Sequence, residues 1–238
     1  MDLSKYNAQI AERTACEPFP ISEEELYERY EKVFTAAVND VLREDGLLNQ
    51  VLPSNLKPLR DGMVMCGSAF TIKGSAGLNF DVDEEMVFRA QLLEKIYPGC
   101  VVVWDCTGDT TSSHYGGMMT KATKKSGCRG AVIDGGIRDT REILKENFPI
   151  FYKYRTSNAM LCRYRITGYE IPIEIGGVRV YPGDIVFGDM DGVIIIPRNK
   201  AYDVLLRAEA IRDNEVGVAG MIDSGMKPTE VVENGGYF

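Results

Sequence analysis

The sequence contains very little histidine and tryptophan, with one residue of each among its 238 residues. A single histidine, His114, argues against a zinc site built from several imidazoles. Cysteine is more frequent, but none of the six cysteines belongs to a C-x-x-C pair. We expect buried free thiols rather than a disulfide framework, because four of the six lie in or beside apolar runs. These four are Cys66, Cys100, Cys106 and Cys128.

Long apolar runs and an excess of positive charge are also missing. No run of eighteen apolar residues is present, so no transmembrane helix is expected. The first twenty residues lack the apolar central region and the cleavage pattern of a signal peptide. The formal net charge of -8 argues against a large footprint for nucleic acid or for an anionic membrane. We therefore expect a cytoplasmic protein whose partners include neither nucleic acid nor membrane.

Three common catalytic and nucleotide-binding motifs are absent as well. The chain has no G-x-G-x-x-G fingerprint, no G-x-x-x-x-G-K-[ST] loop and no G-x-S-x-G nucleophile elbow. The glycines of "KGSAG" (73–77) have the wrong spacing for a phosphate-binding loop. The absence of these motifs therefore excludes assignment to the Rossmann, P-loop and α/β-hydrolase classes.

The apolar pattern that is present alternates between strand and helix periodicity. Apolar residues make up 45% of the chain, which is enough for one good core. Helices are expected over 21–42, with a capping box from Ser22 to Glu25, and over 83–96, 118–127 and 139–148. Strands are expected over 62–72, 100–106, 128–134 and 149–154, with a polar loop over 108–117.

The pattern changes after residue 163. "RITGYEIPIEIGGVRVYPGDIVFGDMDGVIIIP" alternates apolar and polar residues and contains Gly-Gly, Pro-Gly and Asp-Gly pairs, which indicate hairpins. A helix capped near Asn199 then continues to about residue 222. No composition break marks a linker. The sequence therefore predicts one compact α/β domain with a mixed sheet and helical extensions at both ends.

Two neighbouring segments carry candidate chemistry, and "YGGMM" (115–119) is the first. If a helix begins near Gly116, its first-turn amides have no partners inside the helix. Together with the helix dipole, such donors suit a carboxylate or a phosphate. The alternative is an ordinary helix start that binds no ligand. The amides concerned belong to Gly116, Gly117, Met118 and Met119.

The second segment is "RGAVIDGGIRDTREI" (129–143), in which an apolar run leads to two glycines and then to Arg138 and Asp139. The planar guanidinium of Arg138 suits a carboxylate or an enolate oxygen. The carboxylate of Asp139 suits Mg²⁺ or Mn²⁺. The alternative is that Asp139 caps the following helix and Arg138 is a solvated charge. His114 is either a general base beside the anion site or a polar loop residue.

These segments resemble the RraA-like family. The resemblance rests on "YGGMMTKATKKSGCRGAVIDGGIRD", with "FTAAVNDVL" upstream and "VYPGDIVFGDMDGVIIIP" downstream, and runs from about residue 33 to the C-terminus. We accordingly expect an N-terminal helical extension over 1–32 and a single catalytic domain over 33–238. The resemblance implies an α/β/β sandwich like the phosphohistidine swivelling domain, assembled as homotrimers or as dimers of trimers.

The family includes 4-hydroxy-4-methyl-2-oxoglutarate aldolases that also decarboxylate oxaloacetate, with the substrate on a divalent metal at a subunit interface. The resemblance implies that the 116–119 backbone holds the substrate carboxylate. Arg138 would contact the keto or enolate oxygen, and Asp139 would hold the metal with bound waters. A glutamate from the C-terminal helix of a neighbouring subunit would complete the site. Glu215 is our choice for it, with Glu209 in reserve.

The function implied is that of a divalent-metal-dependent lyase acting on a 2-oxo acid, with Mg²⁺ as the expected ion and Mn²⁺ as the alternative. Aldol cleavage and decarboxylation would share a pyruvate enolate, and a metal-polarised water is preferred to His114 as the base. The competing function is that of a non-catalytic, protein-binding regulator like the ribonuclease inhibitor that gives the family its name. A methyltransferase is disfavoured, because the chain has no glycine-rich cofactor fingerprint.

The chain departs from the aldolase pattern at the predicted helix start. Many members carry glutamate where this chain has Gly117, and leucines where it has Met118 and Met119. The hydroxyl-rich "TTSSHY" loop (110–115) leads to the hypothesis of a polyhydroxylated or sugar-acid-like substrate.

Overall fold

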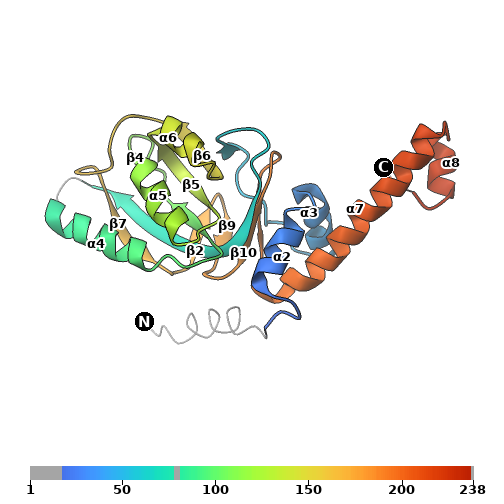
Figure 1. The fold of residues 1–238 in the computed structure, drawn as a ribbon, viewed down its shortest axis with the longest axis horizontal. Coiled ribbons are helices and arrows are strands. Elements are labelled where there is room, and N and C mark those ends of the chain that lie inside the picture. The colour runs from blue at the N-terminus through green and yellow to red at the C-terminus, as the bar shows by residue number, and fades with distance from the viewer. Residues whose placement is uncertain (1–17, 78–80, 237–238) are drawn as a thin grey trace.

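The computed structural model describes residues 18–77 and 81–236, in which a large curled sheet carries helices on one face (Figure 1). Residues 1–17 of the expected N-terminal extension lie outside the described residues. None of the described helices is long and apolar enough to cross a membrane.

The centre of the sheet consists of four parallel strands, in the order β6-β5-β3-β2. All six residues of β3 are buried, as its continuous apolar run predicts. Antiparallel strands complete both edges, so the predicted mixed sheet is confirmed. The parallel strands are β2 (Met65–Ala76), β3 (Cys100–Asp105), β5 (Gly130–Ile137) and β6 (Ile150–Arg155). The antiparallel edge strands are β1 (Lys57–Pro58), β10 (Ile185–Gly188) and β11 (Val193–Ile196).

Two further strands extend the sheet at its carboxyl-terminal edge. Strand β7 (Tyr164–Tyr169) pairs antiparallel with the second half of β2. Strand β4 (Ser113–Tyr115) pairs with the end of β5. The prediction of a polar loop over 108–117 is therefore wrong for these three residues, which form a strand and are all buried.

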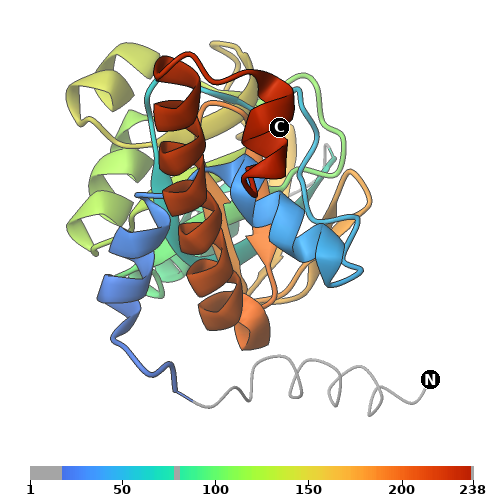
Figure 2. The same ribbon diagram turned by 90° about the vertical axis from the view of Figure 1, so that its right-hand side faces the viewer.

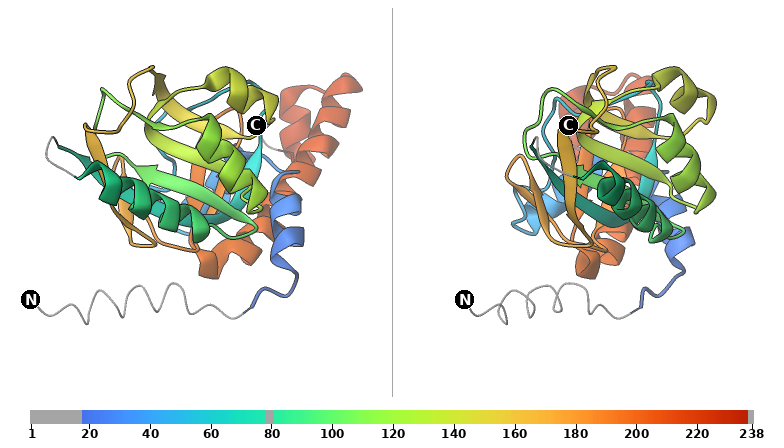
Figure 3. Two further views of the ribbon diagram at one scale, coloured as in Figure 1. Left: turned by 60° about the vertical axis from the view of Figure 1, so that its left-hand side comes forward. Right: turned by 90° about the vertical axis from the view of Figure 1, so that its left-hand side faces the viewer.

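Three helices connect the parallel strands and cover one face of the sheet, as Figure 3 shows. They are α4 (Val82–Glu94), α5 (Gly117–Lys125) and α6 (Thr140–Lys145). Gly127 (φ +82) ends α5 as predicted, because the Cys128 amide donates to the Thr123 carbonyl across a left-handed residue. A core that includes Trp104 and Ile133 fills the space between these helices and the sheet.

A small hairpin forms a second β layer on the opposite face. Strands β8 (Ile173–Ile175) and β9 (Val178–Val180) join through Gly176 and Gly177, whose φ angles of 59° and 84° suit a type I′ turn. The hairpin packs with Val101, Val103 and Val132 of the sheet in a separate apolar cluster. Helices, sheet and hairpin together make the predicted α/β/β arrangement.

Helices α2 (Glu23–Tyr30), α3 (Thr35–Glu44) and the first half of α7 (Ala201–Asp223) pack on β10 and β11, as Figure 2 shows from the side. The 3-10 turn η1 (Arg198–Lys200) precedes α7, and α8 (Pro228–Glu233) packs against α7. The helix begins close to the predicted position, with Lys200 as its N-cap residue, but Asn199 lies in η1 and no side chain caps α7. The second half of α7 extends away from the sheet (Figure 1).

The single helix predicted over 21–42 is also wrong, because the chain forms two helices there. Ser22 caps the first helix as predicted, accepting from the Glu25 amide at 3.1 Å. The second helix begins where the Asp189 carboxylate accepts from the amide and the hydroxyl of Thr35, both at 2.8 Å. A carboxylate distant in sequence thus starts a new helix, which helical periodicity cannot show.

The Glu170 side chain makes fold stability depend on pH, although the residue is exposed. Partial desolvation of its carboxyl raises the pKa of Glu170 to about 7, even though the Thr71 amide donates to its carboxylate at 3.3 Å. The folded state therefore binds this proton more tightly than the unfolded state, and the free energy of unfolding falls as pH rises from 4.5 towards 7.

A Glu170→Gln variant keeps an acceptor for the Thr71 amide and removes the titration. We expect it to be more stable than the parent protein at about pH 8 and to lose this advantage at about pH 4. Urea unfolding at both pH values measures the difference. An advantage that stays constant with pH would contradict the assignment.

Candidate functional site

The site is centred on Asp139, which links the end of β5 to the start of α5. Asp139 adopts a left-handed conformation (φ 55°), which aspartate tolerates better than most residues. Its Oδ2 atom accepts from the Gly117 amide, the first residue of α5, at 3.2 Å. Asp139 precedes α6 but makes no side-chain cap to it. Asp139 therefore does not cap the following helix, α6. Its side chain instead caps the first turn of the neighbouring helix, α5.

Arg138 is held by its main chain and leaves its side chain at the surface of the site. Its amide donates to the Tyr115 carbonyl at 3.0 Å, continuing the pairing of β4 with β5. Its Nε atom lies 3.8 Å from Oδ2 of Asp139, and both side chains are 46% exposed. Arg138 and Asp139 are therefore neighbours that solvent or a ligand can reach.

A cavity of about 420 Å³ opens in front of this pair. Its walls come from α4, β4, the start of α5, the end of β5 and the 159–161 segment, so the two segments singled out in the sequence do meet. The charged lining residues are Arg89, Arg138 and Asp139, and Gly116, Met118 and Met119 line the cavity beside them.

The first turn of α5 offers fewer free donors than the sequence suggested. The amides of Met118 and Met119 have no acceptor in the described part of the chain, so they remain available to an anion. The Gly117 amide is already bound to Asp139. A Cβ atom at Gly116 would lie 2.9 Å from Asp139 Oδ2. Gly116 is therefore needed for the approach of Asp139.

The two glycines before Arg138 belong to β5 and form no ligand loop. A Cβ atom at Gly135 would lie 2.6 Å from His114 Nδ1. A Cβ atom at Gly136 would lie 2.4 Å from the Ser112 carbonyl oxygen. Because both glycines lack a Cβ atom, the buried segment that contains Ser112 and His114 can pack closely against β5.

His114 is buried and uses both ring nitrogens inside the protein. Its Nδ1 atom accepts from the Gly136 amide at 3.2 Å, so the ring proton resides on Nε2, which donates to Asp109 Oδ2 at 3.1 Å. Burial lowers the pKa of His114 more than the nearby Asp109 carboxylate raises it. A neutral ring with both nitrogens occupied is poorly suited to act as a general base.

The hydroxyl-rich segment before His114 also serves the fold. Thr111 donates to the Asp109 carboxylate at 2.7 Å, and Ser113 donates to the Asn158 carbonyl at 2.7 Å. Ser112 is fully buried. These hydroxyls satisfy internal acceptors, so they give no support to the hypothesis of a polyhydroxylated substrate.

The two candidate glutamates of the C-terminal helix lie in different surroundings. Glu209 forms a two-point ion pair with Arg29 of α2, with nitrogen–oxygen distances of 2.8 and 2.5 Å. Glu215 is exposed in α7, whose second half extends away from the sheet (Figures 1 and 2). Glu215 is not among the residues that line the cavity around Asp139.

Among the residues that line the cavity, Asp139 is the one carboxylate that could hold a divalent cation. In residues 18–77 and 81–236, no three histidine, cysteine, aspartate or glutamate side chains gather as a metal site. Oδ1 of Asp139 has no hydrogen-bond donor among these residues. Mg²⁺ commonly keeps several waters and binds proteins through one or two carboxylates. Asp139 thus fits a water-rich site for Mg²⁺ or Mn²⁺.

The sequence reading missed Arg89, a second arginine in the same cavity. It lies in the middle of α4, where a charged residue ordinarily faces solvent, and no motif marks it. Its Nε and Nη2 atoms are buried without hydrogen-bond partners in the described chain.

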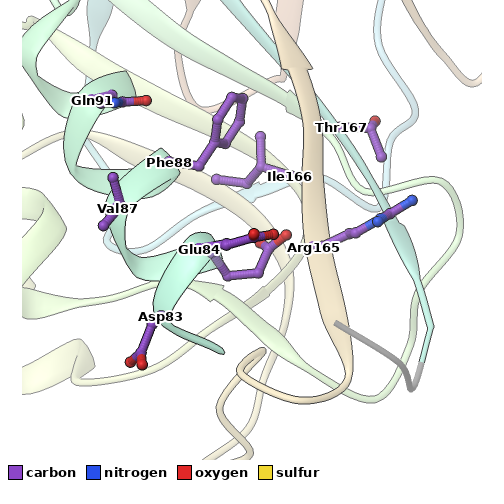
Figure 4. Close-up of a pocket in the computed structure, with 9 residues that line it drawn as sticks. Asp83, Glu84, Val87, Phe88, Gln91, Arg165, Ile166 and Thr167 are labelled. Atoms are coloured by element: carbon purple, nitrogen blue, oxygen red, sulfur yellow. The ribbon is translucent and has the colours of Figure 1, made fainter. Parts of the chain in front are cut away.

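A larger cavity of about 700 Å³ lies on the other side of α4, as Figure 4 shows. Three acidic residues of one helical turn, Asp83, Glu84 and Glu85, line it together with Phe88. The Arg165 guanidinium in Figure 4 points away from α4. These carboxylates would repel the negatively charged carboxylate of a 2-oxo acid. The larger of the two cavities is therefore not the better candidate site.

The neutral state of His114 predicts a specific pH effect on stability. Because the folded protein resists protonation of this ring, stability is lost as pH falls below the ordinary histidine pKa of 6.5. In a His114→Gln variant, the side-chain amide can replace both hydrogen bonds without titrating. We expect the loss between about pH 7.5 and about pH 5.5 to be smaller in the variant, by urea unfolding. Equal losses would contradict the buried neutral histidine.

Comparison with known proteins identifies the family to which the chain belongs. The family model RraA-like, described as Aldolase/RraA, matches residues 35–195, which include every part of the cavity. A protein of Halalkalibacterium halodurans named "Putative 4-hydroxy-4-methyl-2-oxoglutarate aldolase" is 33% identical over 212 residues, covering 84% of this chain and 95% of that protein.

Two solved structures share the fold over most of their length. One, described as "novel cellulases from microbes associated with the gut ecosystem", is 46% identical with a TM-score of 0.84, covering 91% of this chain and 96% of that chain. RraAS2 of Streptomyces coelicolor, "an unusual member of the RNase ES inhibitor RraA protein family", is 27% identical with a TM-score of 0.72, covering 83% and 97%. The chain belongs to the RraA-like family.

Proposed function

We propose that the protein is a divalent-metal-dependent lyase that cleaves a carbon–carbon bond next to a 2-oxo acid. The observation that carries this proposal is the cavity in which Arg138, Asp139 and the free amides of α5 meet. The name of the Halalkalibacterium relative supports a lyase of the aldolase type. Together they favour catalysis over a purely structural role.

The substrate carboxylate would bind at the start of α5. The free amides of Met118 and Met119 and the positive end of the helix dipole favour an anion there. Arg138 would then face the keto oxygen, where negative charge develops as an enolate forms. A donor placed at such a position typically contributes about 3 kcal/mol to transition-state stabilisation.

Asp139 would hold the divalent cation through its free carboxylate oxygen, and Glu215 of a neighbouring copy would complete the site. When bound, the cation supplies Lewis-acid stabilisation for the charge on the keto oxygen. The position of Glu215 on the protruding part of α7 supports a site shared between subunits, as in a homotrimer or a dimer of trimers. The substrate's own oxygens and water would provide the remaining ligands.

In the retro-aldol reaction, the bond between C3 and C4 breaks and its electron pair moves into the enolate of pyruvate. The C4 hydroxyl loses its proton to water and becomes the carbonyl of the second product. Decarboxylation of oxaloacetate leaves the same enolate and releases CO₂ in place of the carbonyl fragment. The enolate then takes a proton at C3 to give pyruvate. We assign the proton transfers to water, because both nitrogens of His114 are occupied.

Two other functions are less well supported by the cavity. Retaining and inverting glycosidases need a pair of carboxylates, whereas Asp139 is the one acidic residue among those lining this cavity. A protein-binding regulator is the second candidate, favoured by the likeness to RraAS2. A regulator that binds another protein has no need of a small-molecule site, so it would not explain the free amides and the exposed Arg138–Asp139 pair.

The decisive assay follows pyruvate release from oxaloacetate with Mg²⁺, against an EDTA control. We expect metal-dependent turnover above the spontaneous rate, and a loss of about a hundredfold in Arg138→Ala because the enolate loses its donor. Asp139→Asn keeps an acceptor for the Gly117 amide, so this variant should fold normally. It should lose the Mg²⁺-dependent release of pyruvate, because the carboxylate that would hold the cation is gone. Arg141→Ala, an exposed arginine of α6, is the matched control and should stay active.

Activity that survives Arg138→Ala unchanged would place the chemistry elsewhere. A folded parent protein with no turnover on oxaloacetate or on 4-hydroxy-2-oxo acids would favour the regulator.

A further inference from the structure

Two buried cysteines meet at the end of the sheet opposite to the candidate site. Cys100 begins β3, and Cys128 lies in the turn that joins α5 to β5. Both thiols are free, and both belong to the apolar core between the helices and the sheet. The candidate site lies at the carboxyl end of β5, so neither thiol takes part in the proposed lyase reaction.

Backbone hydrogen bonds hold the two cysteines side by side. The Gly99 amide donates to the Gly127 carbonyl at 2.9 Å, and the Arg129 amide donates to the Cys100 carbonyl at 2.7 Å. Cys128 lies between the two bonded residues of its own segment, so its main chain runs beside Cys100. Neighbouring strands are about 4.8 Å apart, which falls within the Cα separation of about 4.4 to 6.8 Å that a disulfide spans. A bond between the two sulfur atoms therefore needs little movement of the main chain.

The two side chains are also in contact and differ in their readiness to ionise. The Cys100 thiol donates a hydrogen bond to the sulfur of Cys128. Cys128 in turn donates to the Gly130 carbonyl at 3.2 Å. The hydrogen bond between the thiols lowers the pKa of Cys128, whereas the same bond and burial raise the pKa of Cys100. Cys128 is therefore the thiol that forms the reactive thiolate first.

Cys128 is also the more accessible of the pair. Cys100 is fully buried, whereas Cys128 is 5% exposed. The preceding residue, Gly127, is exposed and ends α5 with a left-handed conformation. Helix ends open locally at a small cost in free energy, so a small oxidant can reach Cys128 through this turn.

We propose that Cys100 and Cys128 are a peroxide-sensitive dithiol that forms a reversible disulfide in the folded protein. The Cys128 thiolate attacks one oxygen of hydrogen peroxide, the O–O bond breaks, and hydroxide leaves and takes up the Cys128 proton as water. Cys100 then attacks the sulfur of the Cys128 sulfenic acid, the S–O bond breaks, and a second water carries away the Cys100 proton. The two thiols lose two electrons in total, and one peroxide is reduced to two waters.

The disulfide would close a covalent loop that contains β3, β4 and the whole of α5. A cross-link that closes a long loop restricts the unfolded chain, so the folded protein gains stability. We expect the oxidised protein to unfold at a higher urea concentration than the reduced protein. Dithiothreitol should reverse this shift. The inference does not depend on the lyase activity, because it concerns a different end of the sheet.

Mass spectrometry after treatment with peroxide tests the pairing directly. The folded full-length protein is treated with hydrogen peroxide, alkylated in denaturant and digested with trypsin. We expect peptide 126–129, which carries Cys128, to be joined to peptide 96–121, which carries Cys100. Dithiothreitol should separate the two peptides.

Two variants identify the partner, because peptide 96–121 also contains Cys106. Cys100→Ala should abolish the link. Cys106→Ala is the matched control, since Cys106 is a buried cysteine of the same apolar core, and this variant should keep the link.

The inference would be overturned if the folded parent protein gave no linked peptide, or if the link formed only in urea. It would also be overturned by a link that persists in Cys100→Ala. An oxidised protein that resists urea no better than the reduced protein would reject the stabilising role of the disulfide.

Discussion

The hydrogen bond from the Gly117 amide to the Asp139 carboxylate is the contact on which the site depends. It fixes the end of β5 against the start of α5, so the chain carries Arg138 to the mouth of the cavity. Glycine at position 116 leaves room for the bond, because a Cβ atom there would lie 2.9 Å from the carboxylate. The bond also requires a residue at 139 that tolerates φ 55° and carries an acceptor, which aspartate satisfies. A helix cap and a candidate metal ligand are therefore the same side chain.

Much of this arrangement could be predicted from the sequence, because it rests on local patterns. The buried run of β3, the glycine end of α5 and the Gly-Gly turn between β8 and β9 follow from periodicity and backbone freedom. The meeting of the 116–119 and 138–139 segments follows from parallel strands that end at one edge of the sheet. Contacts between residues distant in sequence were the ones missed. Asp189 starts a second helix at Thr35, and Gly135 makes room for the His114 ring.

The roles of ionisable residues are also difficult to predict from the sequence, because they depend on contacts between residues distant in sequence. In the sequence His114 is a candidate base and Arg89 is an unremarked helical residue. In the fold their importance is reversed, because the imidazole has both partners it needs and the guanidinium lacks them. Hydrogen-bond satisfaction depends on tertiary neighbours, so only the structure distinguishes a settled polar group from one that awaits a ligand. The resulting cavity has two cations and one anion on its walls, which suits an acidic substrate.

The central claim is that Asp139 of one subunit and Glu215 of another belong to the same catalytic site. The most direct test co-expresses Asp139→Asn and Glu215→Gln chains with different tags and isolates the oligomers that carry both. Each variant alone should lack metal-dependent release of pyruvate from oxaloacetate. In a mixed cyclic trimer, about one site in three combines both intact residues and should recover activity. Mixed oligomers that stay inactive, or a fully active Glu215→Gln variant, would contradict the shared site.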